Sequence, residues 1–238
     1  MVLGFLLVLG QPAEGTRPLD TEDTGTVADG HAELEVSHGY TRDGADDGYV
    51  GGGVLSVGVA PRLEARIEGG VQVFVPEDDV ARGRGTDTLL GMKLRLFDER
   101  HDLPAWLAQV TVRLPTGDAH AGLGARKVDV AGLIAASKVF GDLNVEGNVG
   151  YGFVTRDLAL DYWIANMACE YALARSIVLV SEAVSALYGS AGDDILLLRA
   201  GLLYGWSPCV KLDTAVAFGA TRDAPDLIVT TGVTLSIY

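Results

Sequence analysis

The sequence is short of basic residues and of cysteine, and these shortages exclude several classes of protein. Its 238 residues hold 18 Lys and Arg against 32 Asp and Glu, a formal net charge of −14. Binding of nucleic acid relies on Lys and Arg that neutralise phosphates, so a nucleic-acid partner is excluded. Cys169 and Cys209 lack the CxxC spacing and the neighbouring histidines of a metal site. We therefore expect no metal and no cofactor, and we interpret the two cysteines as small apolar side chains, with a disulfide as the alternative.

The sequence also lacks a long apolar run after its first residues. No later run approaches the roughly 18 residues that cross a bilayer as a helix. Residues 1–10, MVLGFLLVLG, resemble the apolar region of a secretory signal without its basic part, and Gln11 to Ala13 offer a cleavage site. We expect residues 1–15 to form a signal peptide, with a short buried strand as the alternative. Residues 16–30 are polar and acidic and predict an extended periplasmic leader that lacks the apolar periodicity of a plug domain.

What the sequence does contain is a repeated alternation of apolar and polar residues. Between Trp106 and Leu114 the apolar side chains fall on one side, while Gln109, Thr111 and Arg113 fall on the other. A period of two is that of a β-strand, and Pro115 and Gly117 end the strand in a turn. Around residues 62–73 the polar side carries four successive charges of alternating sign, at Arg62, Glu64, Arg66 and Glu68. A barrel that is apolar outside and polar inside accounts for this recurrence.

The alternation predicts about twelve strands, an even number, as bacterial single-chain barrels have. The fold class is therefore all-β, an antiparallel up-and-down transmembrane barrel over residues 31–238 in the outer membrane. Each strand has the roughly 9 to 11 residues that a tilted membrane strand needs. The predicted strands cover residues 32–40, 49–60, 63–73, 86–97, 104–114, 127–139, 142–154, 158–173, 176–188, 194–205, 209–219 and 226–238.

Loop lengths and aromatic residues provide two checks on the barrel. Starting from a periplasmic amino terminus, we expect long outer loops at 41–48, 76–85, 115–126 and 220–225, and short inner turns at 61, 140–141, 174–175 and 206–208. The short connection at 155–157 and the long one at 98–103 break this rule. Aromatic girdles are expected at both membrane interfaces. The outer girdle would hold Tyr40, Tyr49, Phe74, Tyr151, Phe153, Tyr162, Trp163, Tyr188 and Phe218, and the inner one Phe97, Trp106, Phe140, Tyr171, Tyr204, Trp206 and Tyr238.

Two stretches resemble a known family. The motif RLPTGD at residues 113–118 and the stretch RPLDTEDTGTVADGHAELE at residues 17–35 are similar to the outer-membrane barrels assigned to the MetA pathway of phenol degradation. The resemblance implies a passive pore that takes up small compounds, including aromatic or other hydrophobic ones. It also implies three partners: the outer-membrane bilayer, the barrel-assembly machinery, which recognises a terminal aromatic such as Tyr238, and a small-molecule solute.

The lumen is where the function of such a barrel resides, and side-chain parity assigns its residues. Two interpretations remain open: the charges form a constricted polar path for solutes, or they form paired networks that pack the interior. We expect Arg62, Arg66, Arg95 and Arg113 to make lumen contacts, with Glu64 and Glu68 as partners. The full predicted set is Arg62, Glu64, Arg66, Glu68, Lys93, Arg95, Gln109, Arg113, Asn144, Glu146, Asn148, Glu182 and Arg199.

Two other classes of protein compete with a pore. Outer-membrane phospholipases and deacylases are barrels that place a nucleophilic Ser beside a His. His38 and His120, with Ser37, Ser185 or Ser190, are the candidates here, although no GxSxG motif is present. A soluble ligand-binding β-barrel is the other alternative, and it would turn the apolar side chains of Val110 and Val112 inward.

Overall fold

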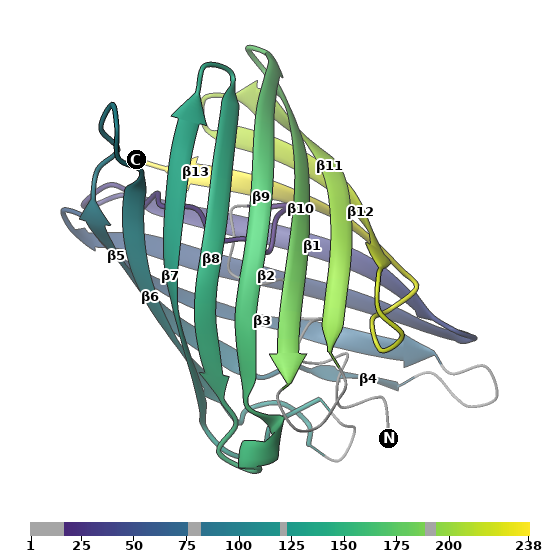
Figure 1. Cartoon of the computed structure of the whole chain (residues 1–238). Coiled ribbons are helices and arrows are strands. Elements are labelled where there is room, and N and C mark those ends of the chain that lie inside the picture. Colours follow the sequence, from purple (N-terminus) through teal and green to yellow (C-terminus); the bar gives the residue numbers. More distant parts are fainter. Residues whose placement is uncertain (1–16, 76–81, 120–122, 189–193) are drawn as a thin grey trace.

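The chain folds into a closed antiparallel barrel (Figure 1). The computed structural model describes residues 17–75, 82–119, 123–188 and 194–238, so the expected signal peptide lies outside the described residues. The strands are β1 (Ala32–Asp43), β2 (Asp46–Ala60), β3 (Leu63–Val75), β4 (Arg82–Gly85), β5 (Thr88–Phe97), β6 (Ala105–Leu114), β7 (Asp129–Phe140), β8 (Leu143–Phe153), β9 (Tyr162–Ala174), β10 (Ile177–Tyr188), β11 (Ile195–Ser207), β12 (Val210–Gly219) and β13 (Leu227–Ile237).

Closure of the sheet comes from the pairing of β1 with β13. Each of the other strands pairs with its neighbours in the chain, and β3 pairs first with β4 and then with β5. The short β4 and β5 are therefore two parts of one strand position, interrupted at residues 86–87, and the barrel has the twelve positions that the alternation predicts. Closure matters because a free sheet edge in lipid would leave backbone groups without hydrogen-bond partners.

The outer wall of the barrel is apolar and the inner wall is polar. On β6 the side chain of Val110 is 52% exposed, whereas the adjacent Gln109 is 3% exposed. On β3 the corresponding exposures are 47% for Ile67 and 2% for Glu68. The soluble-barrel alternative required Val110 to be shielded inside, so the structure contradicts it. Cys169 and Cys209 are free thiols.

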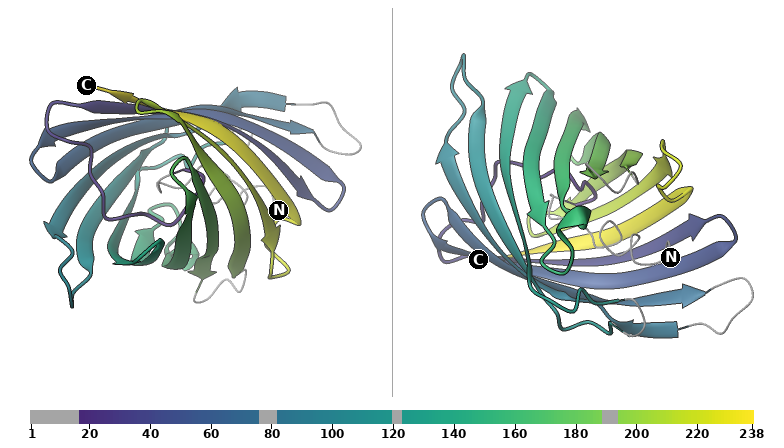
Figure 2. Two further views of the ribbon diagram at one scale, coloured as in Figure 1. Left: turned by 90° about the horizontal axis from the view of Figure 1, so that it is seen from above. Right: turned by 60° about the horizontal axis from the view of Figure 1, so that its bottom comes forward.

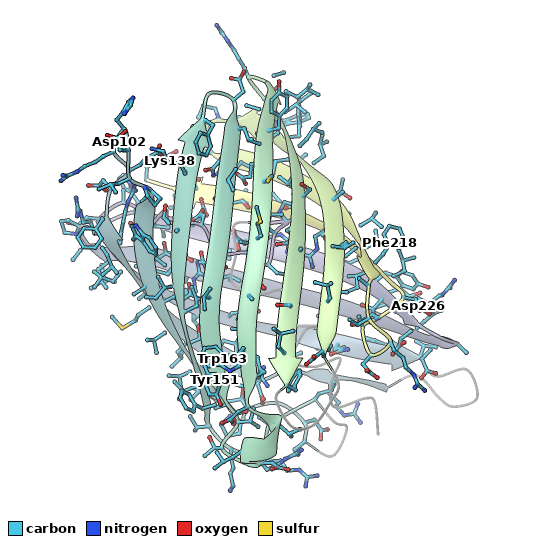
Figure 3. All side chains as sticks on the ribbon, viewed as in Figure 1. Asp102, Lys138, Tyr151, Trp163, Phe218 and Asp226 are labelled. Carbon is cyan, nitrogen blue, oxygen red and sulfur yellow. The ribbon has the colours of Figure 1, made fainter. Side chains whose placement is uncertain are left out.

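Aromatic side chains surround the barrel at its two ends. The rings of Tyr151 and Trp163 meet edge to face with centroids 4.9 Å apart, and both lie near the lower end in Figure 3. At the opposite end, Phe140 and Trp206 are exposed. Two expected members do not belong to the outer girdle. Tyr188 is only 5% exposed and packs on Tyr162 inside the barrel, with ring centroids 5.5 Å apart.

The two ends of the barrel differ in their connections. The loop end carries residues 115–119, 123–128, 154–161 and 220–226, and the turn end carries 61–62, 141–142, 175–176 and 208–209. Because bacterial barrels have short periplasmic turns and longer external loops, the loop end faces outward. The expected outer loop at 41–48 is instead a tight turn, with Gly44 at φ 59°. The connection before β9 is longer than expected, because residues 158–160 form a short helix, η1 (Leu158–Leu160), rather than strand. The turn-end connection at 98–104 is long, as the sequence predicts.

Among the described residues, no helix is long and apolar enough to cross a membrane, and this finding leaves the strands unaddressed. A single substitution tests the assignment of the outer wall to lipid. Val110 lies near the middle of β6 with its side chain on the outer face. We expect Val110→Arg to lower the free energy of unfolding by about 2–4 kcal/mol, the cost of Arg at the bilayer midplane.

The measurement is urea unfolding of the barrel in phospholipid vesicles, with Val110→Leu as the control. Leu keeps the position apolar and should leave the free energy of unfolding within about 1.5 kcal/mol of the parent protein. Equal stabilities for the Arg and Leu variants would show that position 110 does not contact lipid hydrocarbon.

Candidate functional site

The inner wall of the barrel carries most of the residues that the sequence places in the lumen. Eight of them are at most 6% exposed, namely Glu64, Glu68, Lys93, Gln109, Glu146, Asn148, Glu182 and Arg199. The side chain of Arg66 is 9% exposed, and its guanidinium pairs with Glu64 at 3.0 Å, as expected. Arg113 and Asn144 are half-buried on the same inner face. Parity along the strands therefore identifies the lumen-facing residues correctly through the middle of the wall.

At the rim of the turn end, the alternation of side chains along the strands does not identify the lumen-facing residues correctly. Arg62 is an exposed residue of the turn between β2 and β3, where it pairs with Asp98. Its φ of 68° reverses the chain direction, so the alternation of β3 does not extend back to this residue. Arg95 is half-buried near the same rim, and its guanidinium lies 3.0 Å from Asp98. The structure therefore removes Arg62 from the lumen and assigns Arg95 a partner at the rim.

The feature that the sequence analysis missed is a segment inside the barrel. Residues 17–30, which we call the plug, pass through the ring of strands before β1 begins (Figures 1 and 2). Leu19, Thr21 and Glu22 are 2%, 0% and 1% exposed. The expected periplasmic leader is wrong for these residues. Their polar and acidic composition suits a polar lumen as well as it suits water, so composition alone could not separate the two locations.

The plug begins with an ion pair to β12. The guanidinium of Arg17 donates from Nε and Nη2 to the two carboxylate oxygens of Asp213, at 3.2 Å and 3.0 Å. The guanidinium lies directly over Gly232 of β13, where a Cβ would come within 2.3 Å of Nε. The missing side chain at residue 232 thus makes room for Arg17. Both side chains are almost fully buried, and a buried charge without its partner is strongly destabilising. Each charge therefore requires the other.

The next plug residues bind β10 and β11. The carboxylate of Glu182 accepts hydrogen bonds from the backbone N–H groups of Asp20 and Thr21 and from the Thr21 hydroxyl, the last at 2.7 Å. Arg199 donates to Glu182 at 2.7 Å, to the Asp20 carboxylate at 2.7 Å and to the Pro18 carbonyl at 2.8 Å. Glu182 and Arg199 face each other across the β10–β11 ladder. This cross-strand pair is the anchor of the first half of the plug.

Glu22 then joins the plug to the opposite part of the wall. Its carboxylate contacts Lys93 of β5 and Arg66 of β3, the latter at 3.1 Å. Asn148 of β8 holds the backbone of the same residue, accepting from its N–H at 2.6 Å and donating to its carbonyl at 2.8 Å. Five wall strands, β3, β5, β8, β10 and β11, are therefore tied together through three consecutive plug residues.

The last plug residues follow β2 and β3 toward the turn end. The N–H of Val27 donates to Glu64 at 2.8 Å. The Ala28 carbonyl lies where a Cβ of Gly58 would stand, only 2.1 Å from that position. Glycine at residue 58 is thus required for the backbone of the plug to approach β2. The wall accommodates the plug at two glycines and with at least six polar side chains.

The inner wall is not polar throughout. Toward the loop end of β10 to β13 an apolar cluster faces the lumen, and it includes Ala224 from the connection before β13. Its members are Val184, Ile195, Leu197, Ala217, Ala224 and Ile228. The lumen therefore presents a charged region around the plug and an apolar region toward the exterior.

The residues required for a lipid-cleaving enzyme are not brought together. The Ser185 hydroxyl donates to the Ala165 carbonyl at 2.6 Å, and the Ser37 hydroxyl to the Gly52 carbonyl at 3.4 Å. The His38 ring stacks on Tyr49 on the outer face. In the part of the chain that the structure describes, no serine hydroxyl is hydrogen-bonded to a histidine. His120 and Ser190 lie outside the described residues.

Comparisons with known proteins agree with the fold. A family model described as "Putative MetA-pathway of phenol degradation" matches residues 15–237. The COG4313 outer membrane channel from Pseudomonas putida F1 superposes with a TM-score of 0.73 at 12% identity, over 94% of this chain and 100% of that chain. No curated protein matches the chain in sequence.

Two porins have the same architecture. The KdgM porin gives a TM-score of 0.64 at 11% identity, over 87% of this chain and 99% of its own. The NanC porin gives 0.63 at 11% identity, over 85% and 98%. At these identities the similarity establishes an outer-membrane barrel fold and leaves the solute unassigned.

Removal of the Glu22 carboxylate tests how firmly the plug is held. Glu22→Ala removes the plug carboxylate that contacts Lys93 and Arg66, and Lys93 keeps the carboxylate of Asp23, at 3.4 Å, as its remaining plug partner. Breaking a buried pair on one side costs about 3–5 kcal/mol, and the plug can relieve that cost by leaving the lumen. We therefore expect a higher single-channel conductance in planar bilayers.

The matched control is Glu99→Ala, which removes a partly exposed carboxylate that pairs with Lys138 at the turn end. An exposed pair contributes about 0–1 kcal/mol, so this variant should keep the parental conductance. Parental conductance in both variants would mean that the plug is a fixed part of the wall.

Proposed function

We propose that this chain, which belongs to the MetA-pathway phenol-degradation family, is a passive outer-membrane pore for small compounds, including aromatic or other hydrophobic ones. One observation carries the proposal. Within the described residues, every hydrogen bond between plug residues 17–27 and the strands involves at least one side chain, and none joins the backbone of these residues to the backbone of a strand. Residues 17–27 can therefore leave the lumen without breaking the ladders that hold the barrel closed, while Gly30 stays bonded to Gly58 of β2.

The lining of the lumen supports both parts of the proposal. A solute entering from the loop end first meets the apolar cluster around Leu197 and Ile228, which favours compounds with an apolar body. It then meets the charged region around Glu182 and Arg199, which selects among them by polar contacts. No group with a catalytic arrangement is needed, because a concentration gradient drives passive uptake.

Uptake by intact cells tests the pore directly. A Gram-negative host that expresses the chain should accumulate radiolabelled phenol faster than the same host with an empty vector, because the outer leaflet slows apolar solutes. A third strain expresses the Glu22→Ala variant. Its weakened plug should give a faster initial rate of phenol uptake than the parent chain. Equal rates in all three strains would contradict a role in uptake of small aromatic compounds.

Arg113 provides a test of the outer mouth. It lies at the loop end of β6, cross-strand from Asp129 of β7. It has no ion-pair partner within the described ranges, so its charge acts on passing ions. We expect Arg113→Ala to shift ion selectivity toward cations, seen as a changed reversal potential under a KCl gradient.

The control is Arg175→Ala, which removes an exposed charge from the turn between β9 and β10. This charge lies outside the lumen, and the variant should keep the parental reversal potential. Identical potentials for the parent and the Arg113→Ala variant would assign Arg113 to packing alone.

A further inference from the structure

The part of the wall that holds Leu19 to Thr21 has the chemical form of a binding site. Leu19 packs against a small apolar patch on the inner wall, and its side chain is 2% exposed. The patch consists of Ala168 on β9, Val178 and Val180 on β10, and Leu203 on β11. At its centre Val180 is cross-strand from Gly201, which has no side chain. We call these four side chains the Leu19 patch.

A polar edge borders the Leu19 patch. Glu182 is directly cross-strand from Ala168 on one side and from Arg199 on the other, so the three form one row across β9, β10 and β11. Glu182 and Arg199 are each 6% exposed. Glu182 accepts the Thr21 hydroxyl at 2.7 Å, and the Nε of Arg199 has no acceptor among the described residues. One edge of the patch therefore offers a strong acceptor beside an unused donor.

Departure of the plug would leave this edge incompletely bonded. Glu182 would lose three donors, two backbone N–H groups and one hydroxyl, and would keep only Arg199. A buried acceptor without donors is costly, so an occupant that supplies a donor is favoured. The apolar side chains beside it favour an occupant whose remaining surface is apolar.

We propose that the Leu19 patch, with Glu182 and Arg199, binds an uncharged apolar compound that carries a hydroxyl group, and that Leu19 to Thr21 occupy the site as an internal competitor. The proposal rests on the proposed pore function and adds to it the location of the solute and its chemical class. The side chain of Leu19 stands in for the apolar body of the solute. The hydroxyl of Thr21 stands in for its hydroxyl group.

A hydroxyl is the group that satisfies both sides of the polar edge. It donates to Glu182 and accepts from the free Nε of Arg199. A hydrocarbon supplies neither contact. A carboxylate replaces that of Asp20 on Arg199, but it supplies no donor to Glu182 and is repelled by it. Sites built to hydrogen-bond a hydroxyl discriminate strongly against analogues that lack it, because the buried polar groups are then left unpaired.

The plug also sets the apparent affinity. A site that is free only part of the time binds its solute more weakly in proportion to that fraction. A variant with a weaker plug should therefore bind the solute more tightly without any change in the wall. This behaviour separates an internal competitor from a segment that merely fills space.

The experiment measures binding of p-cresol to the purified full chain in detergent by isothermal titration calorimetry, with toluene and benzoate as comparison probes. The plug is weakened by the double substitution Leu19→Ala and Thr21→Ala. We expect the dissociation constant for p-cresol to fall about tenfold in this variant. The plug loses the hydrogen bond from the Thr21 hydroxyl to the charged Glu182, so it competes less strongly with p-cresol. Toluene and benzoate should bind more weakly than p-cresol in both proteins.

The wall is tested in the plug-weakened background. Glu182→Gln should weaken p-cresol binding by about tenfold, whereas Glu99→Gln, which changes a partly exposed carboxylate that pairs with Lys138 at the turn end, should leave it unchanged. Arg199→Lys keeps the positive charge but lacks Nε, and a several-fold loss is expected. A folded barrel changes its gel mobility on heating. If Glu182→Gln fails this test of folding, Arg199→Lys tests whether the polar edge binds p-cresol.

The outcomes are distinct. Tighter binding of benzoate than of p-cresol, or equal affinity in the parent and plug-weakened proteins, would overturn the proposal. Equal losses from Glu182→Gln and Glu99→Gln would do the same. Binding in detergent does not require transport. If the purified protein binds p-cresol but cells that express the chain take up phenol no faster than cells with the empty vector, the pore is rejected and the site is kept. Uptake without p-cresol binding would reject the site and keep the pore.

Discussion

Satisfaction of the backbone in lipid is the constraint on which this structure depends. Hydrocarbon offers no hydrogen-bond partner to an N–H or C=O group, so a sheet that crosses it must have no edge. Pairing of β1 with β13 removes the edge and fixes the register of the first and last strands. Once the sheet is closed, the two-residue period of each strand divides the side chains into a lipid-facing set and a lumen-facing set.

Charge inside the barrel creates a second requirement, and the plug meets it. Asp213, Glu182 and Lys93 are buried, and each has a plug residue among its partners. A buried charge that loses its partner is costly, so the wall and the plug stabilise each other. The structure shows the packed network, and under the proposed function the polar path belongs to a second state. The network exists with the plug in place, and the proposed path opens when the plug leaves.

The sequence predicted the wall better than it predicted the ends and the interior. Gln109, Lys93 and Glu182 were assigned correctly because strand parity is a local property. Arg62 was misplaced because a turn with positive φ interrupts parity, and Tyr188 was misplaced because height along a strand does not decide which face a ring occupies. The plug was missed because its partners lie up to 196 residues away in the chain, the separation between Arg17 and Asp213, and no local pattern links such residues.

By itself the sequence determined the class of fold, the number of strand positions and the side chains that meet lipid, because alternation and turn residues act within a few positions of one another. Only the tertiary structure decided where residues 17–30 lie, because that choice depends on side chains from five separate strands that converge after closure. It also decided that Gly232 and Gly58 make room for the plug, a role that a glycine in a strand does not reveal until the segment above it is seen.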